Sequence, residues 1–136
     1  MTIKLKHIYK EFPTEKSCID LLEKARWGNK PICPHCGLSY YTSLRKQKKY
    51  HCNTCNSSFS VTSTTFLHKT KIDIQKWFFV IRLLSSNDDK ISVRDLAKEI
   101  NVTKDTALRL YNKVKQSFIS ESPFINRILN QLYNGK

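Results

Sequence analysis

The sequence contains the pentapeptide CPHCG at residues 33–37 and the tetrapeptide CNTC at residues 52–55. Each holds two cysteines three positions apart, and fifteen residues separate the two pairs. A zinc ribbon has this spacing, because each pair forms a tight knuckle and a hairpin between the pairs brings the four sulfurs together. Four thiolates leave no coordination position open. We therefore expect one structural Zn²⁺ ion, with the ligands Cys33, Cys36, Cys52 and Cys55.

The residues around the two pairs fit knuckles. A knuckle needs a turn between its thiols and a residue that tolerates positive φ after the second thiol. Pro34 and Gly37 meet this need in the first pair, and Asn56 meets it in the second. A redox dithiol is the alternative, and it is disfavoured because no βαβ pattern surrounds either pair. With four thiols present, we expect His35 and His51 to face solvent or phosphate.

The fifth cysteine lies in a predicted helix from Thr14 to about Arg26. Cys18 shares one helical face with Leu21, Leu22 and Ala25, so we expect it to be a buried apolar side chain. An odd number of cysteines argues against a disulfide framework. The N-terminus lacks the features of a signal peptide, and no apolar run is long enough to cross a bilayer. These features predict a cytoplasmic protein without a membrane partner, associated with the nucleoid if it is bacterial.

The charge of the chain predicts a polyanionic partner. The formal net charge is +13, and no Asp or Glu occurs from Pro31 to Ile72. A solvated loop is the alternative explanation of the basic hairpin, but phosphate contact is favoured because no acid compensates these charges. The residues expected to contact phosphate here are Arg45, Lys46, Lys48, Lys49 and Lys69.

The second half of the chain predicts helices. The stretch DIQKWFFVIRLLSS at residues 73–86 predicts an apolar helix buried between the ribbon and a helical unit. Residues 91–118 predict two helices capped by Ser92 and Thr103, joined by a turn in which Asn101 adopts left-handed φ. This pattern is typical of a helix-turn-helix unit, whose second helix reads DNA. The DNA-contacting residues expected on that helix are Lys104, Thr106, Arg109, Asn112 and Lys113.

The tail ESPFINRILNQLYNGK at residues 121–136 predicts a last helix that begins at a Ser122 cap and ends at Gly135. Its apolar stripe packs back on the helical unit or forms a homodimer, and packing is favoured. The expected fold class is therefore mostly α with a small β zinc ribbon. We expect an N-terminal helical lead-in at 1–30, a zinc ribbon at 31–66, a three-helix helix-turn-helix unit at 67–120 and a C-terminal helix at 121–136.

Residues from Phe12 to about Phe118 resemble the N-terminal DNA-binding region of bacterial insertion-sequence transposases that begin with a zinc ribbon. The segments that carry the resemblance are FPTEKSCIDLLEKARW, CPHCG, HCNTCNSSFSV, TTFLHKTKIDIQKWF and ISVRDLAKEINVTKDTAL. The resemblance implies that the ribbon and the helix-turn-helix unit recognise the ends of a mobile element. It also implies a following nuclease domain that cuts and joins strands.

The sequence departs from that family after Phe118. A nuclease of that type needs three carboxylates on a sheet domain of roughly a hundred residues or more, whereas eighteen residues with the single acid Glu121 follow. We therefore expect no catalytic residues and no enzyme activity in this chain.

Three functions are consistent with the sequence. The first is a structural-zinc, sequence-specific double-stranded DNA-binding protein that regulates transcription or assists DNA transposition. The second is the DNA-binding part of a transposase whose nuclease is absent or supplied by a separate subunit. The third is a zinc-ribbon module that binds RNA or a protein.

Overall fold

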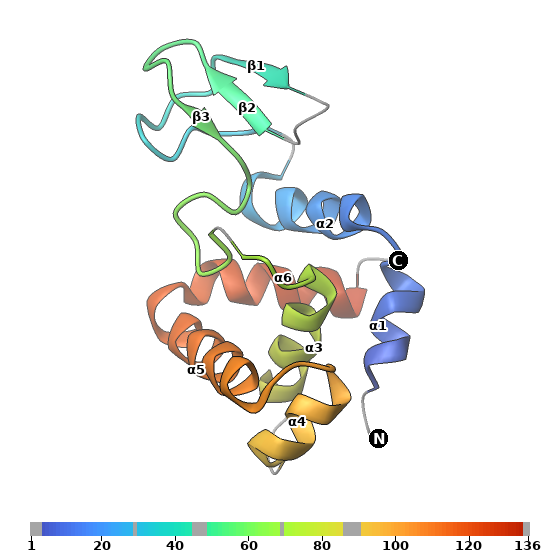
Figure 1. Cartoon of the computed structure of the whole chain (residues 1–136). Helices are drawn as coiled ribbons and strands as arrows, with labels where there is room; N and C mark the ends of the chain where they lie inside the picture. Colours follow the sequence, from blue (N-terminus) through green and yellow to red (C-terminus); the bar gives the residue numbers. More distant parts are fainter. Residues whose placement is uncertain (1–3, 29, 45–48, 69, 86–90, 135–136) are drawn as a thin grey trace.

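The computed structural model describes residues 4–28, 30–44, 49–68, 70–85 and 91–134. Across these ranges the chain forms six helices and a three-stranded sheet (Figure 1). The elements are α1 (Leu5–Glu11), α2 (Glu15–Trp27), β1 (Tyr41–Leu44), β2 (Lys49–Cys52), β3 (Ser58–Phe59), α3 (Ile74–Ser85), α4 (Val93–Glu99), α5 (Lys104–Ser120) and α6 (Ser122–Asn134). The predicted fold class, mostly helical with a small β ribbon, is confirmed.

The sheet is antiparallel in the order β1-β2-β3 and lies at one end of the molecule (Figure 1). Tyr41 stands opposite Cys52 in the β1–β2 pair, and Tyr50 stands opposite Phe59 in the β2–β3 pair. The ribbon has its own small apolar cluster of Cys33, Cys52 and Phe59, against which Trp27 of α2 packs. The ribbon therefore rests on the end of α2.

Helix α2 forms as its sequence predicts. Thr14 caps the helix, and its side chain accepts a hydrogen bond from the N–H of Ser17 at 3.1 Å. The helix ends at Gly28, whose φ of 72° favours a residue without a side chain. Its predicted apolar face is buried, and burial raises the pKa of the Cys18 thiol to about 12. Cys18 is thus a core residue, as expected.

Helix α3 is the centre of the main apolar core. It packs against α1, α2, α5 and α6, and eight of its twelve residues are buried. The prediction that it lies between the ribbon and the helical unit is wrong. Figure 1 shows α2 and α6 between the ribbon and α3. The apolar cluster of the ribbon packs against Trp27 at the end of α2.

The helices α4 and α5 form a capped pair joined by a tight turn. The side chains of Ser92 and Thr103 accept hydrogen bonds from Asp95 N–H and Thr106 N–H, at 3.1 and 3.2 Å. Asn101 adopts the predicted left-handed φ, at 55°. The N–H of Val102 then donates to the carbonyl of Ala97 at 3.0 Å, which closes the turn. These features confirm the predicted caps and turn.

Helix α6 packs within the chain against α2, α5 and α3. Ile125 and Ile128 are fully buried and Leu132 is nearly so. The apolar stripe of α6 is therefore covered by the protein's own helices. Of the two predicted alternatives, packing on the helical unit is the one observed. Nothing in the described residues supports a dimer through this helix. The predicted terminator Gly135 lies outside the described residues.

A single apolar core joins all six described helices. Val61 and Leu67, from the segment between β3 and α3, also belong to it. The division into four units stays a prediction, although each of those units contributes at least one residue to this core. Among the described residues, none of the helices has the length and apolar character needed to span a bilayer.

Candidate metal centre and nucleic-acid interface

The first knuckle is closed by two backbone hydrogen bonds. The N–H of Cys33 donates to the carbonyl of Leu38 at 2.9 Å, and the N–H of Gly37 donates to the carbonyl of Cys33 at 2.8 Å. Gly37 takes a φ of 77°, in the left-handed region that glycine adopts readily. This geometry turns the chain back on itself so that Cys33 and Cys36 face the same space.

The second knuckle repeats this pattern at the same offsets. Cys52 N–H donates to the carbonyl of Ser57 at 2.8 Å, and Asn56 N–H donates to the carbonyl of Cys52 at 2.9 Å. Asn56 has a φ of 62°, which asparagine tolerates better than most side chains do. The sequence prediction that Gly37 and Asn56 adopt positive φ is confirmed. The knuckles are therefore two copies of one backbone turn, placed by opposite ends of the hairpin.

The four thiols meet at one point. The Sγ atoms of Cys33 and Cys55 lie 3.7 Å apart, those of Cys36 and Cys52 lie 3.5 Å apart, and all four lie within 4.8 Å of one another. A tetrahedral Zn–S₄ centre with bonds of about 2.3 Å has sulfur–sulfur edges of about 3.8 Å, whereas a disulfide is about 2.05 Å long. The arrangement fits one structural zinc ion with no position open for substrate.

Backbone N–H groups around the sulfurs favour the thiolate form. The N–H groups of Cys55 and Thr54 point at the Cys52 sulfur, and the Cys55 N–H is the main cause that lowers the Cys52 pKa to about 6. The side chain and backbone of Ser57 lower the pKa of Cys55. At Cys36 the Leu38 N–H acts in the same direction, but burial and the neighbouring thiols raise the pKa to about 12. A divalent cation favours all four thiolates and so offsets the crowding of sulfurs.

The ribbon is fixed to α2 through Tyr50. The Tyr50 hydroxyl donates to Glu23 Oε2 at 2.7 Å, and the Trp27 ring meets the Tyr50 and Phe59 rings edge to face, with centroids 5.8 and 5.7 Å apart. Burial, followed by the Glu23 carboxylate, raises the pKa of Tyr50. The hydrogen bond and the ring contacts hold the hairpin at one orientation on the helix.

Arg26 fixes the segment that leaves the ribbon. Its Nη1 donates to the carbonyls of Val61 and Ser63, each at 2.7 Å, and its Nη2 donates to Thr64 Oγ1 at 3.0 Å. Burial lowers the pKa of Arg26, and the Glu121 carboxylate opposes that shift. Neither Arg26 nor Trp27 was singled out from the sequence as a positioning residue, because their partners lie more than twenty positions away.

Among the predicted phosphate-contacting residues of the ribbon, the structure describes Lys49. Lys49 is exposed at the first position of β2. Arg45, Lys46, Lys48 and Lys69 lie outside the described residues. The two histidines differ: His35 is exposed, whereas His51 is half-buried in β2.

On α5, Arg109 and Asn112 lie on the face opposite the buried residues Leu110 and Val114. Lys104 and Lys113 are exposed on either side of them. Thr106 differs from the expectation, because it is half-buried and its hydroxyl accepts a hydrogen bond from Thr103 at 2.8 Å. Its side chain therefore serves the helix cap, which leaves it less available to a ligand.

Sequence reasoning missed Gln116 and Leu108 on this face. Asp105, Arg109, Asn112 and Gln116 follow the i, i+4, i+7, i+11 rule and form one exposed stripe. Leu108, which is 45% exposed, borders this stripe. The i, i+4, i+7, i+11 spacing could have identified Gln116, but only once the buried side of the helix was known.

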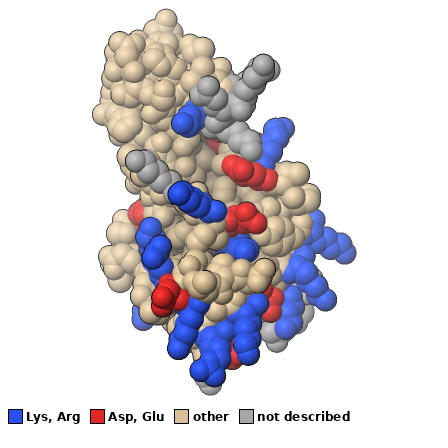
Figure 2. All heavy atoms as spheres, viewed as in Figure 1, with Lys and Arg blue, Asp and Glu red and all other residues tan. Residues whose placement is uncertain are grey.

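The charges on one face of the molecule gather over the helical half. Figure 2 shows Lys and Arg side chains over the part where α1, α4 and α5 lie, with a few acids among them. The ribbon end shows few charged side chains on this face, although some of its residues are drawn as not described. On this face, the described basic side chains therefore gather on the helices rather than on the ribbon.

Comparisons with known proteins agree with the metal centre. Residues 13–58 match the family model described as the transposase zinc-ribbon domain. This region runs from the start of α2 through both knuckles to β3. The resemblance predicted from the sequence is confirmed, and the ribbon is of the transposase type.

One relative extends beyond the ribbon. The chain is 26% identical over 119 residues to a Halobacterium salinarum protein described as an uncharacterized protein in the transposable element ISH50. The alignment covers 85% of this chain but 40% of the relative, so the chain spans less than half of that protein's length. No solved structure matches the chain.

Proposed function

We propose that this protein binds double-stranded DNA in a sequence-specific manner and acts as a regulator or accessory factor related to transposase end-binding regions. The outward face of α5 carries the proposal. An α-helix fits the major groove of B-DNA, and Arg and Asn side chains can each bind a base edge through two hydrogen bonds. Arg109 and Asn112 stand on that exposed face, three positions apart.

The remaining groups on α5 support the same docking. Lys104 at the first turn and Lys113 at the flank suit contacts with phosphates on the two sides of the groove. Asp105 suits a cytosine amino group, and Gln116 suits an adenine. In this proposal α4 and α5 act as a helix-turn-helix pair, with α3 as the third helix behind them.

The zinc ribbon supplies a second contact. In the proposal its hairpin, which starts β2 with the exposed Lys49, binds the phosphate backbone beside the site read by α5. A phosphate contact of this kind benefits from a rigid support. The zinc ion, the Tyr50–Glu23 hydrogen bond and the three Arg26 hydrogen bonds provide that support.

Selection of bound sequences from random duplex DNA, with the zinc-loaded chain, tests the proposal. The expected result is one enriched motif, retained when excess mixed-sequence duplex competes. Parallel binding to a structured RNA provides the comparison. Binding that selects no motif, or tighter binding to the RNA than to any selected duplex, would contradict the proposal.

A second candidate is favoured by the length of the transposable-element relative, of which this chain covers 40%. In that case the chain is the DNA-binding part of a transposition system, and a nuclease subunit is a separate partner. Co-purification from cells that express both proteins tests this candidate. Strand cleavage at the selected motif that requires Mg²⁺ and the second subunit would support it.

A further inference from the structure

Helix α1 is firmly attached to the helical core. Leu5 N–H donates to Glu99 Oε2 at 2.9 Å, at the end of α4, and the Tyr9 hydroxyl donates to Asp73 Oδ2 at 2.7 Å, just before α3. Gln75 Nε2 donates to the carbonyl of Phe12 at 2.8 Å. Three hydrogen bonds thus tie a seven-residue helix to α3 and α4.

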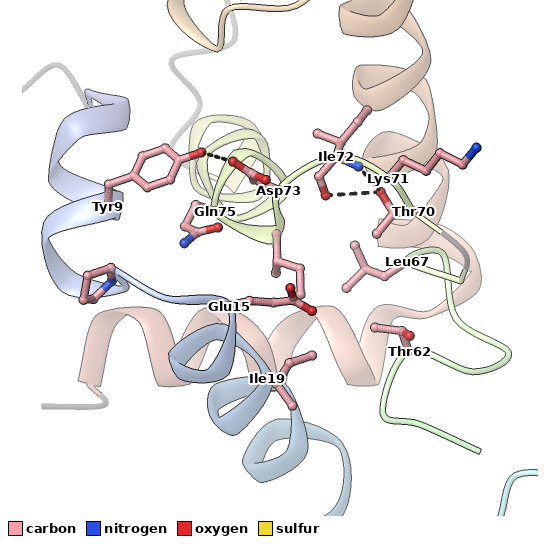
Figure 3. A pocket seen from close by; sticks show the side chains of 12 residues that line it. Tyr9, Glu15, Ile19, Thr62, Leu67, Thr70, Lys71, Ile72, Asp73 and Gln75 are labelled. Carbon is pink, nitrogen blue, oxygen red and sulfur yellow. Dashed lines mark hydrogen bonds between the residues drawn. The ribbon is translucent and has the colours of Figure 1, made fainter. Parts of the chain in front are cut away.

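Apolar contacts reinforce these bonds. Ile8 is fully buried, and the Phe12 ring meets the Phe78 ring edge to face with centroids 5.4 Å apart. Figure 3 shows Tyr9 reaching from α1 to Asp73 beside an open cavity of about 450 Å³, with Glu15 of α2 on another wall. Helix α1 therefore takes its position from α3 and α4.

This attachment places the N-terminal end of α1 beside the end of α4, which precedes the helix proposed to read DNA. Glu99, which binds the Leu5 N–H, lies five positions before Lys104, the first residue of α5. The intervening residues form the tight turn of the α4–α5 pair. The N-terminal end of α1 thus lies beside the turn that leads into α5.

The outward face of α1 is basic. Lys6 and Lys10 are exposed, four positions apart, and lie on the side opposite the buried Ile8. Arg94 and Lys98 are exposed on the neighbouring α4. Asp73 and Glu99 are the acids hydrogen-bonded to α1, and their partners are the Tyr9 hydroxyl and the Leu5 N–H rather than these lysines. Figure 2 shows the resulting basic surface over α1, α4 and α5.

We propose that α1 is a phosphate-binding element of the DNA interface, in which Lys6 and Lys10 contact the backbone that flanks the groove occupied by α5. The inference rests on the proposed DNA binding and adds a third contact to it. Lysine pairs on a rigid helix contribute a sequence-independent, salt-dependent part of the affinity. Helix α1 therefore strengthens binding to every duplex and does not select the sequence.

The test compares two double variants of the full, zinc-loaded chain. Lys6→Gln/Lys10→Gln removes the α1 charges, and Lys24→Gln/Arg127→Gln removes two exposed charges from the α2–α6 side. Affinity for a short mixed-sequence duplex is measured against salt. Each lost phosphate contact reduces the slope of log K against log salt by about 0.9, so the α1 variant should lose about 1.8. The control variant should keep the wild-type slope.

A second readout locates the contact directly. Lysine acetylation followed by mass spectrometry, with and without the duplex, should show protection of Lys6 and Lys10 and no protection of Lys24. Circular dichroism and zinc content confirm that the variants are folded, since all four substituted side chains are exposed.

The results of these experiments separate the inference from the proposed function. A wild-type chain that binds no duplex refutes both. If the wild type binds duplex but the two double variants have equal slopes, or if Lys6 and Lys10 stay reactive in the complex, the inference alone is wrong. A loss by the α1 variant on phosphatidylglycerol vesicles without any loss on duplex would also overturn it.

Discussion

Replacement of Arg26 by Ala should destabilise the protein without releasing zinc. The Arg26 guanidinium donates to two backbone carbonyls at 2.7 Å and to the Thr64 hydroxyl at 3.0 Å, and its carbon lies 5.5 Å from the centroid of the Trp27 ring. A hydrogen bond to a charged group contributes about 1.5–3 kcal/mol. Arg26 is half-buried, and desolvation of its charge opposes the gain from its hydrogen bonds. We therefore expect the free energy of unfolding to fall by about 2–4 kcal/mol, which is less than the sum of three such bonds.

Urea unfolding of the zinc-saturated chain, followed by far-UV circular dichroism, measures this loss. With an m-value of about 1.5 kcal/mol/M, the midpoint should fall by about 2 M. Arg26→Lys keeps the charge but cannot reach three acceptors at once, so it should recover part of the stability. Lys24→Ala, on the same helix and exposed, is the matched control and should change stability by less than about 0.5 kcal/mol.

Zinc content separates the role of Arg26 from that of the metal site. The Arg26→Ala variant should still bind one zinc ion, because the guanidinium donates to the segment that leaves the ribbon, whereas the four sulfurs gather between the two knuckles. A midpoint equal to that of Lys24→Ala would refute the reasoning. Loss of zinc by Arg26→Ala would show that Arg26 supports the knuckles as well as that segment.

Three further predictions concern the metal, the backbone and the last helix. In a Trp77→Phe variant, zinc removal by chelation should shift the fluorescence emission of Trp27 to the red, because Trp27 packs on the ribbon. Most of the far-UV circular dichroism of the helices should remain, because the helices share a separate core. An unchanged emission spectrum would contradict the role of the metal. Thr64 holds a φ of 62°, which β-branched residues rarely adopt, so Thr64→Asn, whose side-chain oxygen can still accept from Arg26, should raise stability by about 0.5–1 kcal/mol. Thr64→Val stays β-branched and removes the acceptor of the Arg26 hydrogen bond, so it should lower stability; urea midpoints measure both changes. Ile128→Ala should lower the free energy of unfolding by about 2–5 kcal/mol, because Ile128 is buried within one chain. The thermal midpoint of the wild type should not vary with protein concentration; a midpoint that rises with concentration would support a homodimer instead.

The knuckles and most helices could be predicted because their signals are local. The Cys-x-x-Cys pairs, the capping residues Thr14, Ser92 and Thr103, and the positive φ of Asn101 each depend on a few neighbouring residues. The fold class followed from these features. The transposase-type ribbon could be recognised from the same short segments.

Helix α1 could not be predicted, because its stabilising contacts are distant. The helix is short, and its cap residue Lys4 makes no side-chain hydrogen bond. Its position depends on Glu99, Asp73 and Gln75, which lie more than sixty positions from their partners. A window of sequence around residues 5–11 contains none of these groups.

The position of the ribbon also depends on contacts between residues far apart in the sequence. The apolar helix α3 was expected to need the ribbon as a cover, but α1, α2, α5 and α6 cover it. The residues that fix the ribbon are Glu23, Arg26 and Trp27, at the end of α2, and their partners come later in the chain. Similarly, the exposed stripe on α5 that includes Gln116 required knowledge of which side of the helix is buried.

Whether α5 reads the DNA sequence is best measured by the affinity of the wild type and Arg109→Ala for two duplexes, one selected and one scrambled, across a range of salt. Arg109→Ala should lose about 1–3 kcal/mol of binding free energy on the selected duplex and much less on the scrambled one. Lys49→Ala, in contrast, should weaken both equally and reduce the salt slope by about 0.9. An equal loss on the two duplexes for Arg109→Ala would contradict the claim that α5 reads the sequence.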